Sequence, residues 1–144
     1  MAAKKLRLRI ITPEQIKVDE DVDMVIMRCT TGNMGVLPGH EAYSAALKNG
    51  VLRILDGGTE RRIAIYGGFA STQNSVLTIL TNGAEWPEDV DRTRVEADRE
   101  HAERRLRERT DDIDIQHDQV LLRRALVQME ICSNPPTSEG ERVE

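Results

Sequence analysis

The stretch Lys5–Ile10, KLRLRI, decides the fold class of the first part of the chain. Its basic and apolar side chains alternate strictly. Because successive side chains of a β-strand point to opposite faces, this period of two predicts a half-buried strand. Thr12 and Pro13 follow and are expected to end it.

Further apolar runs follow along the chain, and turn-forming residues lie beside most of them. These runs are Val22–Cys29, Val51–Leu55, Arg62–Tyr66 and Val76–Leu80. Short runs with glycine, proline or asparagine between them are typical of a β-sandwich or barrel. The sequence predicts no helix between them, so we do not expect parallel βαβ units.

The composition of the chain changes at Trp86-Pro87, which we interpret as a domain boundary. Residues 1–86 carry ten Lys/Arg and nine Asp/Glu, whereas residues 87–144 carry ten Arg and sixteen Asp/Glu. All lysines and all aromatic residues precede the boundary. The net charge of −5 argues against nucleic acid as a partner, since binding phosphate needs a basic face.

Other compositional features indicate a folded protein of a reducing compartment. No apolar run approaches the ~20 residues that cross a bilayer, and Met1–Ile11 lacks the apolar segment of a secretory signal. Cys29 and Cys132 form no CxxC pair and are expected to be free thiols. No set of Cys, His and carboxylate residues has the spacing of metal ligands, so we expect no metal site.

Two helices are predicted in the last third of the chain, Asp91–Arg109 and Ile115–Ile131, with Asp114 as the N-cap of the second. The first has a thin apolar stripe, made of Val95, Ala102 and Leu106. The second has a main apolar face of Ile115, Leu122, Leu126 and Met129, widened by Val120, Leu121, Ala125 and Val127. The first helix cannot cover this surface, so we expect a second partner for it, either the sandwich or another protein. Competition between two partners for one surface is the physical basis of a switch.

Catalytic motifs are not found in the sequence. It contains no GxxxxGK[ST], GxGxxG, HExxH or GxSxG. His40 follows a Pro-Gly turn, and we interpret it as structural or interfacial, because no partner for a general base is recognisable near it. We therefore expect no catalytic residue, and a chain that is not an enzyme by itself.

Residues 30–40, TTGNMGVLPGH, combine three glycines and a proline with apolar residues. Two interpretations stay open. The segment is either a long connection that crosses between two sheets, or a shaped surface loop that presents Met34 and its neighbours to a partner.

Part of this segment, Gly32–His40, resembles the G-x-[LM]-G-[IV]-x-P-G-H hallmark of the epsilon subunits of F-type ATP synthases. Gly50–Ile54, Gly67–Leu80 and Asp111–Asp114 resemble further segments of that family, in the same order. The resemblance covers about residues 4–131.

The resemblance implies a mainly β plus α fold. We expect a ten-stranded β-sandwich at residues 1–86, an antiparallel two-helix hairpin at 87–132 and a disordered tail at 133–144. It also implies a central-stalk (rotor) subunit of the proton-translocating synthase, which couples the catalytic head to the c ring. The sandwich would bind the gamma subunit and the c ring. The hairpin, when extended into the alpha/beta head, would block ATP hydrolysis.

Such a subunit would lie at the cytoplasmic face of a bacterial membrane, or at the stromal face of a plastid thylakoid, and meet the membrane only through the complex. The resemblance places the contact with the c ring and gamma at Thr31, Gly32, Asn33, Met34, Gly35 and His40. Arg123 and Arg124 lie together near the apolar surface of the second helix, and we expect them to dock on acidic segments of the catalytic head, because arginine pairs well with carboxylates.

Some family members bind regulatory ATP on the folded hairpin. The residues here that match their pattern are Glu85, Asp91, Arg94 and Arg124. Val95 replaces an alanine of the pattern, and Gln128 replaces an arginine that pairs with phosphate. Asp91 also suits an N-cap and Arg94 a solvated side chain, so we expect weak ATP binding or none and no other cofactor.

Two other classes of function stay open at this point. One is a stand-alone ligand-binding sandwich, which would need an apolar or aromatic-lined pocket. The other is an ATP-sensing regulator that acts without the synthase.

Overall fold

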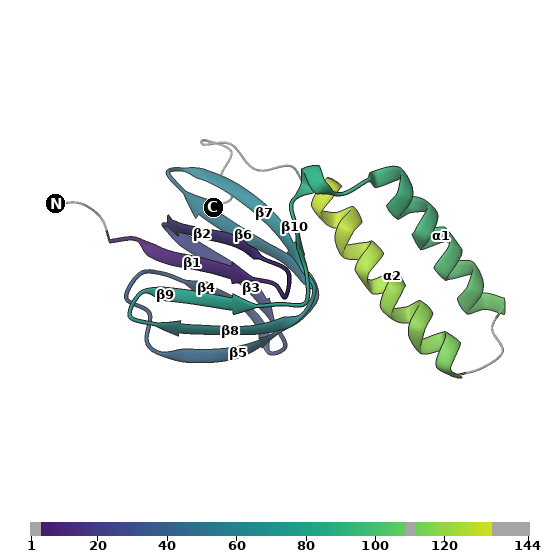
Figure 1. The fold of residues 1–144 in the computed structure, drawn as a ribbon, viewed down its shortest axis with the longest axis horizontal. Helices are drawn as coiled ribbons and strands as arrows, with labels where there is room; N and C mark the ends of the chain where they lie inside the picture. The colour runs from purple at the N-terminus through teal and green to yellow at the C-terminus, as the bar shows by residue number, and fades with distance from the viewer. Residues whose placement is uncertain (1–3, 109–111, 134–144) are drawn as a thin grey trace.

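The computed structural model describes residues 4–108 and 112–133, and in these it has a β-sandwich followed by a helical hairpin (Figure 1). Its strands are β1 (Leu6–Ile11), β2 (Ile16–Val22), β3 (Met24–Cys29), β4 (Gly32–Val36), β5 (Tyr43–Leu47), β6 (Gly50–Asp56), β7 (Thr59–Ile65), β8 (Gly68–Gln73), β9 (Val76–Leu80) and β10 (Ala84–Glu85). A 3₁₀ turn, η1 (Pro87–Asp89), leads to the helices α1 (Arg92–Glu108) and α2 (Asp112–Ser133). The predicted ten-stranded sandwich and helical hairpin are thus confirmed.

The ten strands form one hydrogen-bonded sheet, which folds into the two layers of the sandwich. One layer has the order β10-β7-β6-β3, with β4 on the other edge of β3, and the second has the order β5-β8-β9-β1-β2. The layers join where Cys29 of β3 pairs with Leu47 of β5. Among the described strands β1 and β9 run parallel, whereas every other pair is antiparallel.

The sandwich core confirms the alternation of the first strand. Leu6, Leu8 and Ile10 are fully buried, whereas Arg7 extends outward to the carboxylate of Asp19, with 2.8 Å between Nε and Oδ1. The inner faces of both layers contribute the rest of this apolar cluster. Burial of these side chains is the main source of stability of the sandwich.

The interpretations of residues 30–40 need correction, because residues 32–36 form a strand. β4 pairs with β3 in register, with Met34 opposite Met27 and Asn33 opposite Arg28. Residues 32–36 are therefore not a free loop, and the connection from the first layer to β5 of the second layer is confined to the residues that follow Val36. A Cβ on Gly35 would lie 2.6 Å from Cε of Met24, so a larger residue at this position would displace the end of that side chain. Glycine and asparagine have low strand propensity, and here pairing with β3 overrides it.

The predicted run Val22–Cys29 is divided into two strands at Asp23. The carboxylate of Asp23 accepts hydrogen bonds from the backbone N–H of Gly57, at 2.9 Å, and from Nζ of Lys5, at 2.6 Å. It therefore ties the β2–β3 turn to the β6–β7 turn. Besides β4, the strands β2, β5, β8 and β10 were not among the runs predicted from the sequence pattern.

The hairpin agrees with the sequence in α1 and differs from it in α2. Asp91 caps α1 by accepting the backbone N–H of Arg94 at 3.2 Å. Asp114 is not an N-cap, because α2 already begins at Asp112. Leu126, expected on the main apolar face of α2, is 49% exposed, and the buried positions among residues 116–132 are instead Asp118, Ala125, Val127 and Ile131. α2 is apolar around most of its circumference, so periodicity could not identify the face that packs.

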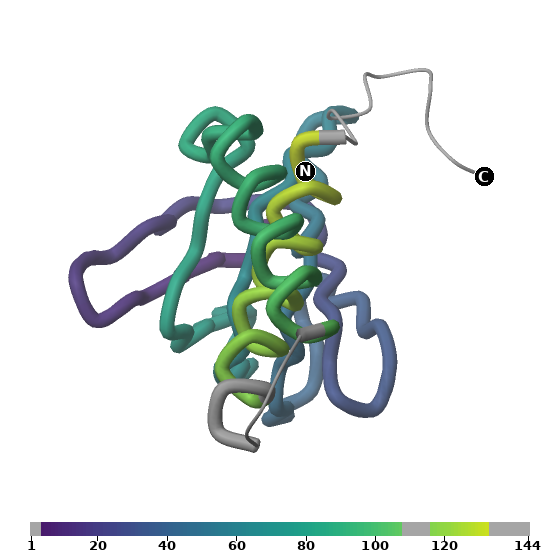
Figure 2. The backbone as a smooth tube through the Cα atoms, turned by 90° about the vertical axis from the view of Figure 1, so that its right-hand side faces the viewer, coloured from purple at the N-terminus to yellow at the C-terminus, as the bar shows by residue number. Residues whose placement is uncertain are grey.

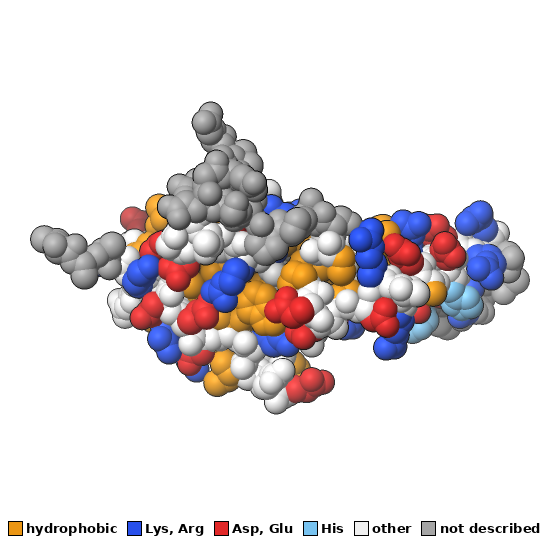
Figure 3. All heavy atoms as spheres, turned by 90° about the horizontal axis from the view of Figure 1, so that it is seen from above, with side chains coloured by type: hydrophobic (Ala, Val, Ile, Leu, Met, Phe, Trp, Pro, Cys, Tyr) orange, Lys and Arg blue, Asp and Glu red, His pale blue; other side chains and the backbone are white. Residues whose placement is uncertain are grey.

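The hairpin projects from one end of the sandwich, with α1 and α2 side by side (Figures 1 and 2). On the face in Figure 3, charged side chains dominate the hairpin and hydrophobic ones gather over the sandwich. α2 is the helix that packs on the sandwich, and α1 packs on α2. The disordered tail was predicted for residues 133–144, but Ser133 is the last residue of α2, and residues 134–144 lie outside the described residues.

Candidate functional site

A groove of about 490 Å³ lies where β10, η1, α1 and α2 meet. It is lined by Glu85, Asp89, Val90, Asp91, Arg94, Val95, Asp98, His101, Ala102, Leu121, Arg124, Ala125 and Gln128. The structure thus brings together all four residues that match the ATP pattern. It also places both departures from that pattern, Val95 and Gln128, in the same wall.

The carboxylate of Glu85 is the centre of a polar cluster in this groove. Its Oε1 accepts a hydrogen bond from Oη of Tyr66 at 2.6 Å and another from Nε2 of Gln128 at 2.9 Å. The guanidinium of Arg124 lies 3.5 Å from the same oxygen. Glu85 itself is held by β10, which pairs with Ala64 of β7. One carboxylate on the sandwich therefore contacts two side chains of α2.

Tyr66 is shared between the sandwich and the hairpin. Burial, followed by the hydrogen bond to Glu85, raises the pKa of its hydroxyl well above the usual value. The hydroxyl is therefore a permanent donor at any physiological pH. The guanidinium of Arg124 stacks over its ring, 4.3 Å from the centroid.

Asp91 and Arg94 line the groove, but their contacts are made within α1 and its N-cap. Asp91 is the N-cap described above, and the Arg94 side chain is 81% exposed and lies 4.0 Å from the carboxylate of Asp98. Val95 is only 4% exposed and fills the wall behind them. The groove has four carboxylates against two guanidinium groups and one histidine, which does not favour a polyanion.

Apolar contacts reinforce the junction of α2 with the sandwich. Val127 and Ile131 pack on Ala64 and Tyr66, with Val51, Val90 and Cys132 at the margin. A second polar contact lies beside them, where the guanidinium of Arg28 is 3.4 Å from the carboxylate of Glu130. The C-terminal half of α2 is thus the part of the hairpin that docks on the sandwich.

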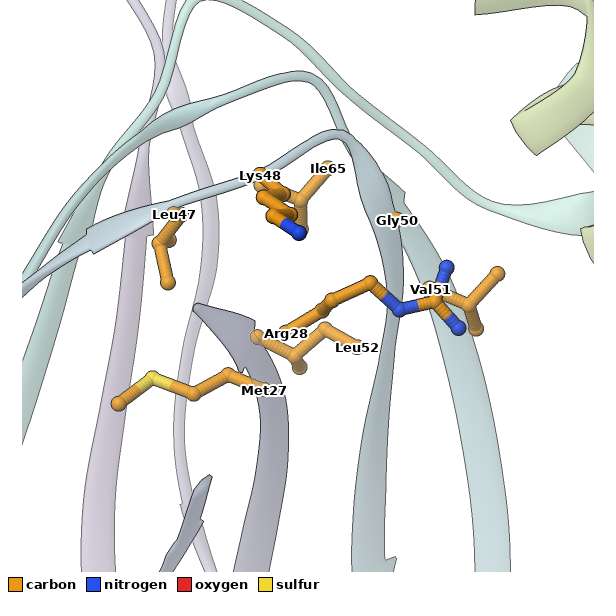
Figure 4. A pocket seen from close by; sticks show the side chains of 8 residues that line it. All are labelled: Met27, Arg28, Leu47, Lys48, Gly50, Val51, Leu52 and Ile65. Carbon is orange, nitrogen blue, oxygen red and sulfur yellow. The ribbon is translucent and has the colours of Figure 1, made fainter. Parts of the chain in front are cut away.

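The Arg28 side chain extends across β6 beside Gly50 and Val51 (Figure 4), and its guanidinium contacts Glu130 of α2. A Cβ at Gly50 would lie 2.8 Å from Cδ of Arg28, so only glycine leaves this path open. The cavity beneath, bounded also by Lys48 and Leu52, has a volume of about 10 Å³. That is room for about one water molecule and not for a ligand.

The residues predicted to contact the c ring and gamma do not form one patch. Gly32 pairs with Cys29 at the hairpin end of the sandwich, and Thr31, Asn33 and Gly35 are exposed along β4, with Met34 half-buried. His40 lies at the opposite end. Its Nδ1 is 2.8 Å from the carbonyl oxygen of Glu41 and 3.5 Å from Oγ1 of Thr72.

The two arginines predicted to dock on the head differ in their surroundings. Arg124 faces the groove and contacts Glu85, although half of its side chain is exposed. Arg123 is exposed on α2. Nearby on the same helix Val120, Leu121 and Leu126 are also exposed, at 57%, 44% and 49%.

An apolar row on the outer face of the second layer was missed at the level of sequence. Phe69 pairs with Leu80, Leu80 with Ile11, and Ile11 with Ile16, so the row crosses β8, β9, β1 and β2. Phe69, Leu80 and Ile16 are 48%, 53% and 53% exposed. A hollow of about 340 Å³ lies beside Ile11 and Leu80. Apolar residues at the outward positions of strand ends were the available signal.

Gly68 makes the close approach in this row possible. Its φ is +122°, and a Cβ there would lie 2.2 Å from the carbonyl oxygen of Leu80. Any other residue would push β8 away from β9 and separate Phe69 from Leu80.

Two kinds of site are not found in the described part of the chain. Within residues 4–108 and 112–133 no three His, Cys, Asp or Glu residues lie together in a way that could hold a metal ion. None of the helices described there combines the length and the apolarity that crossing a membrane requires.

Two family models match the chain almost from end to end. The beta-sandwich domain of the ATP synthase delta/epsilon chain matches residues 5–87, and the long alpha-helix domain of the same chain matches residues 88–133. The fold and these matches define the class of protein, which is a non-catalytic subunit of an ATP synthase.

The chain belongs to the ATP synthase delta/epsilon family, and the curated relatives it matches are epsilon chains. It is 36% identical to the ATP synthase epsilon chain of Bacillus velezensis over 91% of this chain and 99% of the relative. It is 40% identical to that of Syntrophobacter fumaroxidans, over 90% and 97%, and 40% identical to that of Prochlorococcus marinus strain NATL1A, over 74% and 78%. The family resemblance is confirmed.

Solved structures have the same fold. A chain of the Euglena gracilis mitochondrial ATP synthase, in a structure of OSCP, F1 and c-ring, has a TM-score of 0.78 at 26% identity, over 90% of this chain and 82% of that one. A chain of the Tetrahymena thermophila mitochondrial ATP synthase central stalk and c-ring has a TM-score of 0.61 at 12% identity, over 92% and 99%, and supports the fold alone.

Proposed function

We propose that this epsilon-type subunit is a rotor component of a proton-translocating F-type ATP synthase. In this proposal the sandwich (residues 1–86) binds gamma and the c ring, and the hairpin (87–132) regulates ATP hydrolysis. The protein then lies peripherally at the cytoplasmic face of a bacterial membrane, or at the stromal face of a thylakoid. The curated relatives named above support the bacterial alternative.

The observation that carries the proposal is the apolar row of Phe69, Leu80, Ile11 and Ile16. A row of half-exposed large side chains across four strands is costly in water unless a partner covers it. Because the row extends across four neighbouring strands, it suits another folded protein rather than a small ligand. We assign this face to gamma.

We assign the c-ring contact to β4 and to the turns at its end remote from the hairpin. Leu37 is 54% exposed and Tyr43 is 43% exposed at that end, beside His40. Asn33 and Met34 lie along β4 between the two ends. This arrangement leaves the hairpin free to reach toward the catalytic head while the other end approaches the membrane ring.

The hairpin has the surface that a regulatory element needs. In the folded state α2 still exposes Val120, Leu121 and Leu126, and Arg123 lies beside them. These side chains suit a partner with apolar and acidic groups, as expected for the alpha/beta head. The groove offers ATP few cationic partners, so regulation by ATP is weak or missing in this proposal.

Binding to gamma tests the proposal. Purified full-length chain is mixed with a bacterial gamma subunit, and complex formation is measured by size exclusion and calorimetry. We expect a stable one-to-one complex without nucleotide. A chain that stays monomeric beside gamma, and binds ATP tightly instead, would favour a free-standing ATP sensor.

A further inference from the structure

We propose that Glu85 acts as an intramolecular clasp that fastens the folded hairpin to the sandwich without any bound ligand. Its carboxylate joins the sandwich directly to two side chains of α2, Gln128 and Arg124. The inference rests on the proposed function only for its consequence, which is control of hairpin release. The clasp itself is a property of the isolated chain.

The acceptor of the clasp is fixed in space before the hairpin docks. Glu85 lies on β10, whose partner Ala64 belongs to the first layer of the sandwich. The Tyr66 hydroxyl, also on the sandwich, donates to Oε1 at 2.6 Å and orients the carboxylate. The remaining contacts of this oxygen come from Gln128 and Arg124, which are four residues apart and therefore on one face of α2.

The chemistry of these donors explains why no ligand is needed. An ionised carboxylate accepts several hydrogen bonds at once, and bonds to a charged acceptor are stronger than neutral ones. Gln128 contributes a neutral amide, which satisfies Glu85 without leaving a second positive charge to be balanced. Only 24% of the Glu85 side chain is exposed, so water competes weakly for it.

Release of the clasp frees the whole hairpin. α1 packs on α2 and meets the sandwich chiefly through it, so what holds α2 also holds α1. The apolar contacts of Val127 and Ile131 and the Arg28–Glu130 pair act in the same half of α2. The clasp adds a directional contact to this small apolar interface.

Hydrogen exchange of the full-length chain without nucleotide tests the clasp. Tyr66→Phe removes one hydroxyl and keeps the ring under Arg124, and Gln128→Ala removes the amide donor. The matched controls are Tyr43→Phe and Gln119→Ala, at exposed positions of β5 and α2. We expect amide exchange in α1 and α2 to rise about tenfold or more in both test variants, as for the loss of a hydrogen bond to a charged group, with β1 and β9 unchanged.

Three results would overturn the clasp. The first is unchanged exchange of α2 in both test variants. The second is an equal rise in β1 and β9, since that indicates general destabilisation. The third is a tenfold protection of α2 in the wild-type chain when millimolar ATP is added, because a ligand would then hold the hairpin.

A separate measurement distinguishes failure of the clasp from failure of the proposed function. The same variants are assembled with the synthase and ATP hydrolysis is measured. Faster exchange of α2 with unchanged hydrolysis contradicts the regulatory role and leaves the clasp in place. Unchanged exchange contradicts the clasp whatever the hydrolysis rate.

Discussion

The carboxylate of Asp118 on α2 lies 3.4 Å from Nε of Arg105 on α1, and the two side chains differ sharply in burial. The Asp118 side chain is 2% exposed and that of Arg105 is 44% exposed. The buried partner is therefore the acid, between two helices that have few large apolar side chains to share. This asymmetry predicts different costs for removing the two partners.

We expect Arg105→Ala to destabilise the hairpin by about 1–3 kcal/mol, because it leaves a buried carboxylate without its cation. Asp118→Asn should cost less, since Arg105 can turn into water. Helicity measured by circular dichroism during urea unfolding of the full-length chain compares the two variants. Equal costs, or a larger cost for Asp118→Asn, would contradict the assignment of the cost of Arg105→Ala to an unpaired buried carboxylate.

A charge placed in the apolar row should weaken binding to gamma. Phe69→Glu and Leu80→Glu should each raise the Kd by roughly tenfold or more, because a buried carboxylate would replace an apolar contact. Both side chains are half exposed in the free chain, so its folding should be retained. Leu37→Glu, equally exposed at the far end of the sandwich, is the control. Equal weakening by the control would show that this face is not the gamma surface.

The proposed contact with the c ring is tested on β4. Asn33→Lys should lower the coupling of proton flow to ATP synthesis, since Asn33 is an exposed, outward position of an edge strand; Met34 packs partly against the sandwich core and is left unchanged. The isolated variant should keep its thermal unfolding temperature. Coupling is measured in membrane vesicles as synthesis against proton uptake. Unchanged coupling removes this strand from the interface.

Removal of the hairpin should raise ATP hydrolysis. A chain that ends after Trp86 is expected to assemble, because the sandwich has the proposed rotor contacts. Arg123→Ala should reproduce part of the rise and is cleaner than Arg124→Ala, since Arg124 also contacts Glu85. Hydrolysis by the assembled synthase is measured with and without ADP. A truncated subunit that assembles and leaves hydrolysis unaltered would contradict the inhibitory role.

The lowered pKa of the buried Glu60 leads us to expect that the sandwich loses stability in acid. Burial acts to raise the pKa of its carboxyl, but hydrogen bonds from Arg53 and Arg62 outweigh burial and hold the pKa below its ordinary value. A carboxyl whose pKa is lower in the folded than in the unfolded chain stabilises the fold at pH values above its unfolded-state pKa, about 4.3 for Glu. This stabilisation is lost as the pH falls through the folded-state pKa.

We therefore expect the free energy of unfolding to decline below about pH 4.5, and to decline less steeply in Glu60→Gln. Glu14→Gln, at an exposed position, is the matched control and should keep the wild-type slope. Urea unfolding between pH 3 and 7 gives the slopes. The same slope in Glu60→Gln and the wild type would assign the acid sensitivity to other carboxylates.

Local sequence patterns were sufficient to predict an element where the residues next to it in the chain decide its structure. The alternation in Lys5–Ile10, the strand Val76–Leu80 and the cap at Asp91 all follow from local geometry, and each was predicted. β4 was not, because glycine and asparagine disfavour a strand until β3 offers its hydrogen bonds.

The sequence by itself determined the fold class, the family and six of the residues that line the groove: Glu85, Asp91, Arg94, Val95, Arg124 and Gln128. Only the tertiary structure decided what those residues do. Glu85, Tyr66 and Gln128 are far apart in the chain, and their hydrogen bonds exist because α2 returns to the β7–β10 edge. The face of α2 and the apolar row were decided in the same way. The sequence shows which side chains are apolar and how they are spaced. Only packing against other elements determines which of them remain exposed to water.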